Sequence, residues 1–144
     1  MRSKGTATWN GDLFGGSGEV SLASSGAAGP LPVSWASRTE AANGKTSPEE
    51  LIAAAHAACY SMAFSNMLAQ AEHTADQLDT SAVATFAKTD AGMRITTMEI
   101  TVVGQVPGIS ADEFAELAEG AKNGCPVSNA LAGNVEITLN ASLA

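Results

Sequence analysis

The residues from Ser47 to about Ala71 predict one long helix that is apolar on nearly every side. Ser47 fits the N-cap, Pro48 the first helical position and Glu50 the third, which is the pattern of a capping box with its proline in the preferred place. A helix that is apolar all round must be buried all round. One chain of 144 residues has too little material to surround such a helix, so we expect a second subunit to cover it.

The segments on both sides of this helix alternate apolar and polar residues, as β-strands do. Before the helix we predict a meander of two strands and an edge strand, and after it a long antiparallel hairpin and a last strand. The expected strands are 5–10, 18–23, 33–35, 81–88, 93–106 and 135–143, with the hairpin turn at 90–92.

Two further helices are predicted late in the chain. Ser110 and Glu113 repeat the capping-box pattern, which predicts a helix to about Lys122. Gly124 breaks that helix, and Pro126 can start a short one through residue 131. Mixed strands and helices of this kind indicate an α+β fold.

Composition excludes several classes of partner. The formal net charge of −8, without long acidic runs, argues against nucleic acid and anionic membrane surfaces. The start Met1-Arg-Ser-Lys-Gly lacks an apolar signal region, and we expect no stretch that approaches the roughly 20 apolar residues of a membrane span. We therefore expect a cytoplasmic protein, whose two cysteines stay reduced and are catalytic, metal-binding or incidental.

The two cysteines stand in different settings. Cys59 falls inside the alanine-rich helix, and Cys125 follows Gly124 at the start of the short helix. Each one alone reads as a small buried hydrophobe. Together in space they would form a redox centre, because a peroxide can oxidise one sulfur and the other can resolve it as a disulfide.

Other functions remain open from the residues alone. His56 precedes Cys59 by three positions, so a Cys–His pair of an acyl-transfer enzyme is one alternative, although a histidine on an apolar helix is more often a core residue. A metal module would use His56, Cys59, Cys125 and His73, but the close C-x-x-C spacing of structural zinc sites is absent. A purely structural dimer is the third alternative.

Four pieces of the chain resemble the OsmC family in order and spacing. They are Trp9-Asn-Gly11, Arg38, the run from Ser47 to Cys59, and Gly124-Cys-Pro-Val-Ser128. The resemblance covers nearly the whole chain and is closer to the OsmC branch of the OsmC/Ohr superfamily than to the organic-hydroperoxide-resistance branch. The stretch 23–29 has no counterpart in the pattern, so substrate preference is not carried over.

The resemblance implies a single OsmC-like domain over residues 1–144, with an α+β fold in which antiparallel sheets enclose central helices of an intertwined homodimer. The implied activity is that of a thiol-dependent peroxidase, an antioxidant enzyme of the stress response. It would reduce organic hydroperoxides, and hydrogen peroxide less well. No cofactor or metal is implied, and the reductant would be a dithiol such as dihydrolipoamide.

The resemblance also implies roles for four residues. Cys59 attacks the peroxide, Cys125 resolves it through a Cys59–Cys125 disulfide, Arg38 lowers the pKa of the attacking thiol, and Glu49 holds Arg38 in place. Local sequence alone favours a surface arginine and a first-turn acid at these last two positions. Glu49 and Cys59 are ten residues apart, a rise of about 15 Å on one helix. Either the helix breaks between them or, as we expect, Arg38 and Glu49 serve the Cys59 of the partner chain.

Bulky residues around Cys59 could favour an alkyl substrate, although at helical spacing they are more often core than pocket. They are Ile52, Tyr60, Met62 and Phe64.

Overall fold

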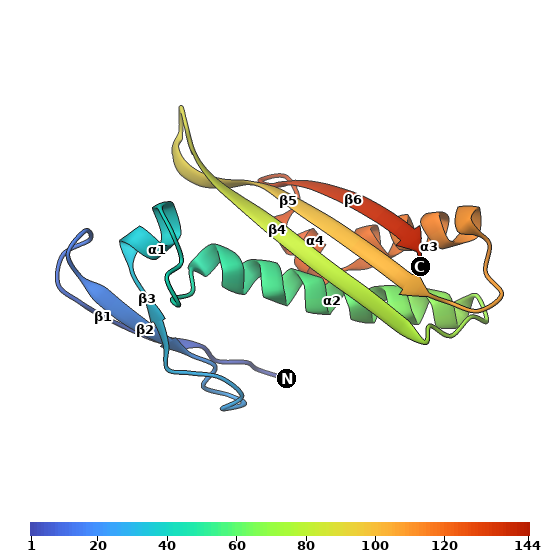
Figure 1. The fold of residues 1–144 in the computed structure, drawn as a ribbon, viewed down its shortest axis with the longest axis horizontal. Coiled ribbons are helices and arrows are strands. Elements are labelled where there is room, and N and C mark those ends of the chain that lie inside the picture. The colour runs from blue at the N-terminus through green and yellow to red at the C-terminus, as the bar shows by residue number, and fades with distance from the viewer. The chain divides into compact units, whose positions relative to one another are not determined.

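The computed structural model describes all of residues 1–144, which form two compact units, Met1–Leu51 and Ile52–Ala144 (Figure 1). The boundary between the units falls in the first turn of helix α2 (Pro48–Gln70). The single domain expected over residues 1–144 stays a prediction.

The first unit contains a three-stranded antiparallel sheet in the order β1-β2-β3, which confirms the predicted meander. Its strands are β1 (Thr6–Asn10), β2 (Ser17–Ser21) and β3 (Leu31–Val33). Trp9 pairs with Gly18 across β1 and β2. A Cβ at Gly18 would lie 2.6 Å from the Thr8 carbonyl oxygen and 2.8 Å from the Trp9 ring, so only glycine fits beneath this indole.

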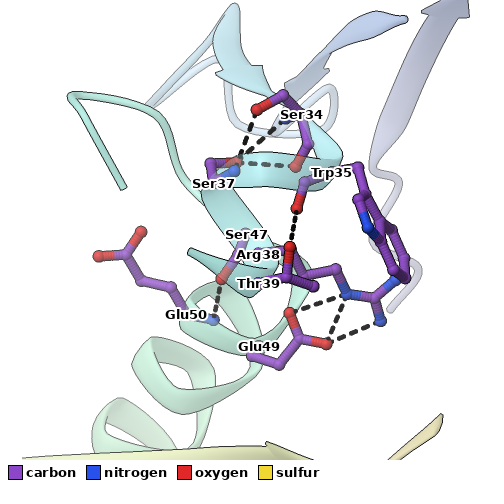
Figure 2. A network of polar contacts seen from close by, with 8 residues as sticks. All are labelled: Ser34, Trp35, Ser37, Arg38, Thr39, Ser47, Glu49 and Glu50. Atoms are coloured by element: carbon purple, nitrogen blue, oxygen red, sulfur yellow. Dashed lines mark hydrogen bonds and ion pairs between the residues drawn. The ribbon is translucent and has the colours of Figure 1, made fainter. Parts of the chain in front are cut away.

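A short helix, α1 (Trp35–Thr39), follows β3, and the sequence did not predict it. The expected edge strand through residue 35 is wrong, because β3 ends at Val33 and Ser34 caps a helix. The Ser34 hydroxyl accepts from the Ser37 N–H, and the Ser37 hydroxyl accepts from the Ser34 N–H, each at 3.1 Å. This reciprocal capping box, with serine in place of the usual glutamate, puts Arg38 on a helix (Figure 2).

Helix α2 begins where the sequence predicted, and its cap is half of the expected box. The Glu50 N–H donates to the Ser47 hydroxyl at 3.1 Å. The Glu50 carboxylate accepts from the Thr46 hydroxyl at 2.6 Å. A contact between that carboxylate and the Ser47 backbone, which would complete the box, is not formed.

Helix α2 is much less buried by its own chain than its composition would require. Only 28% of its most apolar 18-residue window is buried, and the mean hydropathy of that window is 1.2. By length and composition the helix could cross a membrane, so the expectation that no stretch approaches a span is wrong on that measure. Core helices of water-soluble proteins meet the same criterion.

The second unit contains a three-stranded sheet in the order β4-β5-β6. Its strands β4 (Gln77–Thr89) and β5 (Gly92–Gln105) form the predicted hairpin, with a bulge between Thr85 and Phe86. Strand β6 (Glu136–Leu143) pairs parallel with β5, so this sheet is mixed, whereas the expectation was of antiparallel sheets. Helices α3 (Ala111–Gly124) and α4 (Pro126–Leu131) supply the crossover that a parallel pair requires.

The core of the second unit joins one face of α2 to β5 and α3. The buried side chains on α2 recur every four residues, those on β5 every two, as a helix and a half-buried strand require. These side chains are His56, Tyr60, Phe64 and Leu68 on α2, Met98, Ile100 and Val102 on β5, and Phe114, Ala118 and Ala121 on α3.

Aromatic contacts fix the packing of α2 against α3. The Tyr60 hydroxyl donates to the Ala118 carbonyl at 3.1 Å, and the rings of Phe64 and Phe114 meet edge to face at 5.0 Å. The Phe114 ring occupies the space of the missing side chain at Gly104, where a Cβ would lie 2.5 Å from it. Tyr60 and Phe64 are therefore core residues and not the walls of a substrate pocket.

Candidate active site

The two cysteines lie together in the second unit, as the family resemblance implied. Both are free thiols, and each shifts the pKa of the other. Cys59 lies near the middle of α2, while Cys125 ends α3 and caps α4. The break at Gly124 and the proline at position 126 bring the second thiol to the helix that carries the first.

The two thiols differ in access. Cys59 is half-buried and lines a cavity of about 370 Å³, whereas Cys125 is 0% exposed and does not line it. The other lining residues are mainly small or apolar: Met62, Ala63, Asn66, Met67, Ala121, Gly124 and Pro126. A small molecule that enters this cavity therefore meets the sulfur of Cys59 first.

The two thiols also differ in acidity, and the more accessible thiol, Cys59, is the less acidic one. Burial raises the pKa of Cys59, and the interaction with Cys125 raises it further, against one lowering contact from the Val127 N–H. Burial also raises the pKa of Cys125, but the nearby Ser128 N–H, Cys59, the Ser128 hydroxyl and the Val127 N–H together lower it below the ordinary value. Within one chain, Cys125 is therefore the more acidic of the two thiols.

A buried pair beside the thiols was missed at the sequence level. His56 Nε2 lies 2.8 Å from the Ser128 Oγ, and the two side chains come from α2 and α4. The sequence offered one signal that Ser128 has a role at this site. It lies three residues after Cys125, the spacing at which an N3 residue can contact its N-cap.

The contacts of the histidines weaken both alternative functions. His56 bonds to Ser128 and not to Cys59, so the imidazole does not act as a base on that thiol. His73 lies 3.4 Å from the Glu113 carboxylate, and the structure contains no group of three or more His, Cys, Asp or Glu side chains that could hold a metal ion.

Arg38 and Glu49 form the predicted pair in the first unit (Figure 2). Arg38 Nε donates to both carboxylate oxygens, at 2.9 and 3.1 Å, and Nη2 donates to Oε1 at 2.7 Å. Glu49 is only 6% exposed, and the Arg38 Cζ lies 5.8 Å from the Trp35 ring centroid. The guanidinium is thus held in one orientation by a carboxylate and an aromatic ring.

A second cavity, of about 360 Å³, lies beside this guanidinium in the first unit. Its lining is largely aromatic and aliphatic: Trp9, Leu13, Val33, Ser34, Trp35, Arg38 and Pro48. The cavity offers apolar walls next to a single cation, which suits a molecule with an alkyl or aryl part and a polar end.

The fold and the thiols together define an α+β dithiol protein with one accessible and one sealed sulfur. A family described as "OsmC-like protein" matches residues 41–140, and the chain belongs to this family. The chain is 45% identical to "Peroxiredoxin OsmC" of Escherichia coli (strain K12) over 143 residues, which cover 99% of this chain and 97% of the relative. It is 32% identical over 94 residues to "Organic hydroperoxide resistance protein OhrA" of Bacillus subtilis (strain 168), which cover 65% of each chain.

Solved structures share the fold. OhrB of Bacillus subtilis, an organic hydroperoxide resistance protein, superposes with a TM-score of 0.79 over 98% of both chains at 23% identity. An organic hydroperoxide resistance protein from Elizabethkingia anophelis gives a TM-score of 0.76 over 100% of this chain and 99% of that chain, at 25% identity. The predicted α+β fold of the OsmC family is therefore confirmed.

Proposed function

We propose that this chain is a thiol-dependent peroxidase that reduces organic hydroperoxides, with Cys59 as the attacking thiol and Cys125 as the resolving thiol. One observation carries the division of roles: Cys59 lines a cavity, and the sealed Cys125 lies close enough to shift its pKa. The names of the relatives, a peroxiredoxin and organic hydroperoxide resistance proteins, support the reaction and the substrate class.

The reaction needs two steps at the Cys59 sulfur. The thiolate attacks one peroxide oxygen, the O–O bond breaks, and the departing alkoxide takes a proton to become an alcohol. Cys59 is left as a sulfenic acid, which Cys125 attacks with loss of water to form the disulfide. The contact between the two side chains supports this second step without a large movement.

The first step requires a cation that stabilises the Cys59 thiolate. Burial and Cys125 both raise the pKa of Cys59, so the thiol needs an opposing positive charge to lose its proton. We assign this role to the Arg38 guanidinium, held by Glu49. Helix α2 is continuous, and the ten residues from Glu49 to Cys59 span about 15 Å of it, so we assign Arg38 to the Cys59 of a partner chain.

The exposed face of α2 supports a homodimer. Exposed residues, most of them small, recur along the helix at three- and four-residue spacing, which permits close approach of a second helix. They are Ala54, Ala55, Ala58, Met62, Ser65, Asn66 and Ala69. A second copy of the chain would cover an apolar helix that its own chain leaves largely open.

The free thiols support a proposal for the reductant and for the location. A disulfide that forms in each turnover must be reduced in each turnover, so we propose a dithiol reductant, of which dihydrolipoamide is one example. Two free cysteines that cycle in this way suit the cytoplasm, where thiols are kept reduced.

The thiol roles predict that two cysteine variants fail differently. Cys59→Ser should consume no peroxide, whereas Cys125→Ser should consume about one equivalent per chain and stop at a sulfenic or overoxidised state. The measurement is a single-turnover assay with cumene hydroperoxide, followed by mass spectrometry of the protein. If Cys125→Ser reacts no faster than Cys59→Ser, the assigned roles are wrong.

A further inference from the structure

A buried histidine–serine pair lies beside the resolving thiol, where the attack on the peroxide does not need it. His56 is 0% exposed and Ser128 is 5% exposed. The His56 Nε2 to Ser128 Oγ distance of 2.8 Å joins helices that are 72 residues apart in sequence. Burying polar side chains costs free energy unless they are paired, so we expect this buried pair to have a role.

The unpaired ring nitrogen of His56 decides the direction of the hydrogen bond. Burial lowers the pKa of His56, so the imidazole is neutral and only one nitrogen carries a proton. A proton on Nδ1 would be a buried donor without a partner, because Nδ1 has none. The proton therefore lies on Nε2, which donates to the Ser128 Oγ and leaves the hydroxyl hydrogen for another acceptor.

The nearby group is the sulfur of Cys125, three residues before Ser128 at the start of α4. The hydroxyl and the backbone N–H of Ser128 lie close enough to lower the pKa of that thiol. His56 thus holds the Ser128 side chain by one buried hydrogen bond, and Ser128 in turn lowers the pKa of the resolving thiol.

We propose that His56 and Ser128 are positioning residues for the reductive half of the cycle, and that they hold Cys125 so that it leaves as a thiolate when a reducing thiol attacks Cys59. The proposal rests on the Cys59–Cys125 disulfide of the proposed function. It concerns a different step, since neither residue touches the peroxide.

Access determines which sulfur is attacked. Cys59 lines the 370 Å³ cavity and Cys125 is sealed, so a reducing thiolate reaches Cys59 Sγ. The new S–S bond forms there, the protein disulfide breaks, and its electron pair leaves on Cys125 Sγ, which Ser128 stabilises. A thiol of lower pKa leaves faster in such an exchange.

The second thiol of the reductant then completes the step. It attacks the mixed disulfide, and Cys59 leaves and takes a proton. The dithiol has become a disulfide and two electrons have passed to the protein. Of the two protons of the dithiol, one goes to Cys59 and the other goes to Cys125 or to solvent, according to the pH.

The test separates reduction from peroxide chemistry by forming the disulfide with diamide. Oxidised protein is mixed with dithiothreitol, and the appearance of free thiols is followed by rapid quench. Ser128→Ala should be reduced about five-fold more slowly, because the leaving thiolate loses a hydrogen bond. Ser128→Thr keeps the hydroxyl and should react at close to the wild-type rate.

Removal of a different serine hydroxyl, on α2, provides the matched control. The Ser61 hydroxyl bonds to the Ala57 carbonyl at 2.9 Å and to Thr80 at 2.8 Å, and to neither thiol. Ser61→Ala should therefore be reduced at the wild-type rate. At His56, the Gln variant keeps a side-chain N–H donor and should stay fast, while His56→Leu should be slow. If His56→Leu does not fold, the Ser128 variants still decide.

The site of attack gives a second readout. Oxidised wild-type protein treated briefly with 2-mercaptoethanol and then acidified should carry the adduct on Cys59, as shown by peptide mapping. An adduct on Cys125, or a Ser128→Ala protein reduced as fast as Ser61→Ala, would overturn the proposal. A wild-type protein that is reduced normally but consumes no cumene hydroperoxide would instead refute the proposed peroxidase function.

Discussion

Mixed dimers provide a decisive test of whether Arg38 acts on its own chain or on its partner. Glu49 binds the guanidinium with contacts of 2.7 to 3.1 Å, which ties Arg38 to the first turn of α2. Ten residues separate Glu49 from Cys59 on that helix, a rise of about 15 Å and a rotation of about 80°. We therefore expect a guanidinium held there to serve a partner's thiol and not its own.

Subunit exchange gives each arrangement a different expected fraction of the wild-type activity. Cys59→Ser and Arg38→Ala are each expected to be inactive, the second because loss of a nearby cation raises a thiol pKa by about 1–3 units. Mixed in equal amounts with random exchange, half of the dimers are heterodimers. If the site is shared, each heterodimer has one intact site, so about one quarter of the wild-type activity should return. If each chain uses its own arginine, nothing returns.

A reciprocal mixture guards against a false negative. The double variant Cys59→Ser/Arg38→Ala is mixed in equal amounts with wild type. With a shared site every heterodimer is dead and about one quarter of the sites remain, whereas with separate sites about one half remain. Native mass spectrometry measures the heterodimer fraction, and a coupled assay measures hydroperoxide consumption. The shared site is refuted if heterodimers are confirmed, the first mixture has no activity, and the second mixture keeps one half of the wild-type activity.

Two substitutions within single chains test the other assignments. Arg38→Lys keeps the charge but loses the two-pronged contact with Glu49, so peroxidase activity should fall about ten-fold or more while the circular dichroism spectrum is unchanged. Near-normal turnover would show that Arg38 acts only as a point charge or is a surface residue. Phe114→Ala removes a ring that is 1% exposed and packs 5.0 Å from Phe64, and should lower the free energy of unfolding by about 3–5 kcal/mol in urea denaturation. A loss below about 1 kcal/mol would mean that this core can collapse around the gap.

Local sequence signals predicted most elements because those signals are physical causes. The Ser47 cap and Pro48 start α2, and Pro126 starts α4 at the predicted residue. The alternation of the hairpin strands matches their burial on one face. The pairing of Cys59 with Cys125 was inferred from family motifs and is a contact in the structure.

The elements and contacts that the sequence did not predict also have physical reasons. Helix α1 was not predicted, and its first residue, Trp35, was included in the expected edge strand because it follows a proline-containing β-segment. The cap of α1 uses Ser37 where glutamate is the usual signal. The parallel pairing of β6 depends on the path of the chain through α3 and α4, which alternation within a strand does not record. The contact of His56 with Ser128 joins residues far apart in sequence, and its hydrogen-bond direction depends on burial.

Helix α2 combines two surfaces in one apolar sequence, and the position of Cys59 between them explains the asymmetry of the thiols. His56, Tyr60 and Phe64 recur every four residues and are sealed inside the second unit. Met62, 67% exposed, marks the opposite, open surface. Cys59 lies about 100° around the helix from Tyr60, so it borders the buried face and still opens to a cavity. One additional residue between His56 and Cys59 would rotate the thiol by about 100°, onto the buried face and out of reach of peroxide. In the proposed cycle the accessible sulfur therefore attacks the peroxide and is later attacked by the reductant, while the sealed sulfur resolves and leaves.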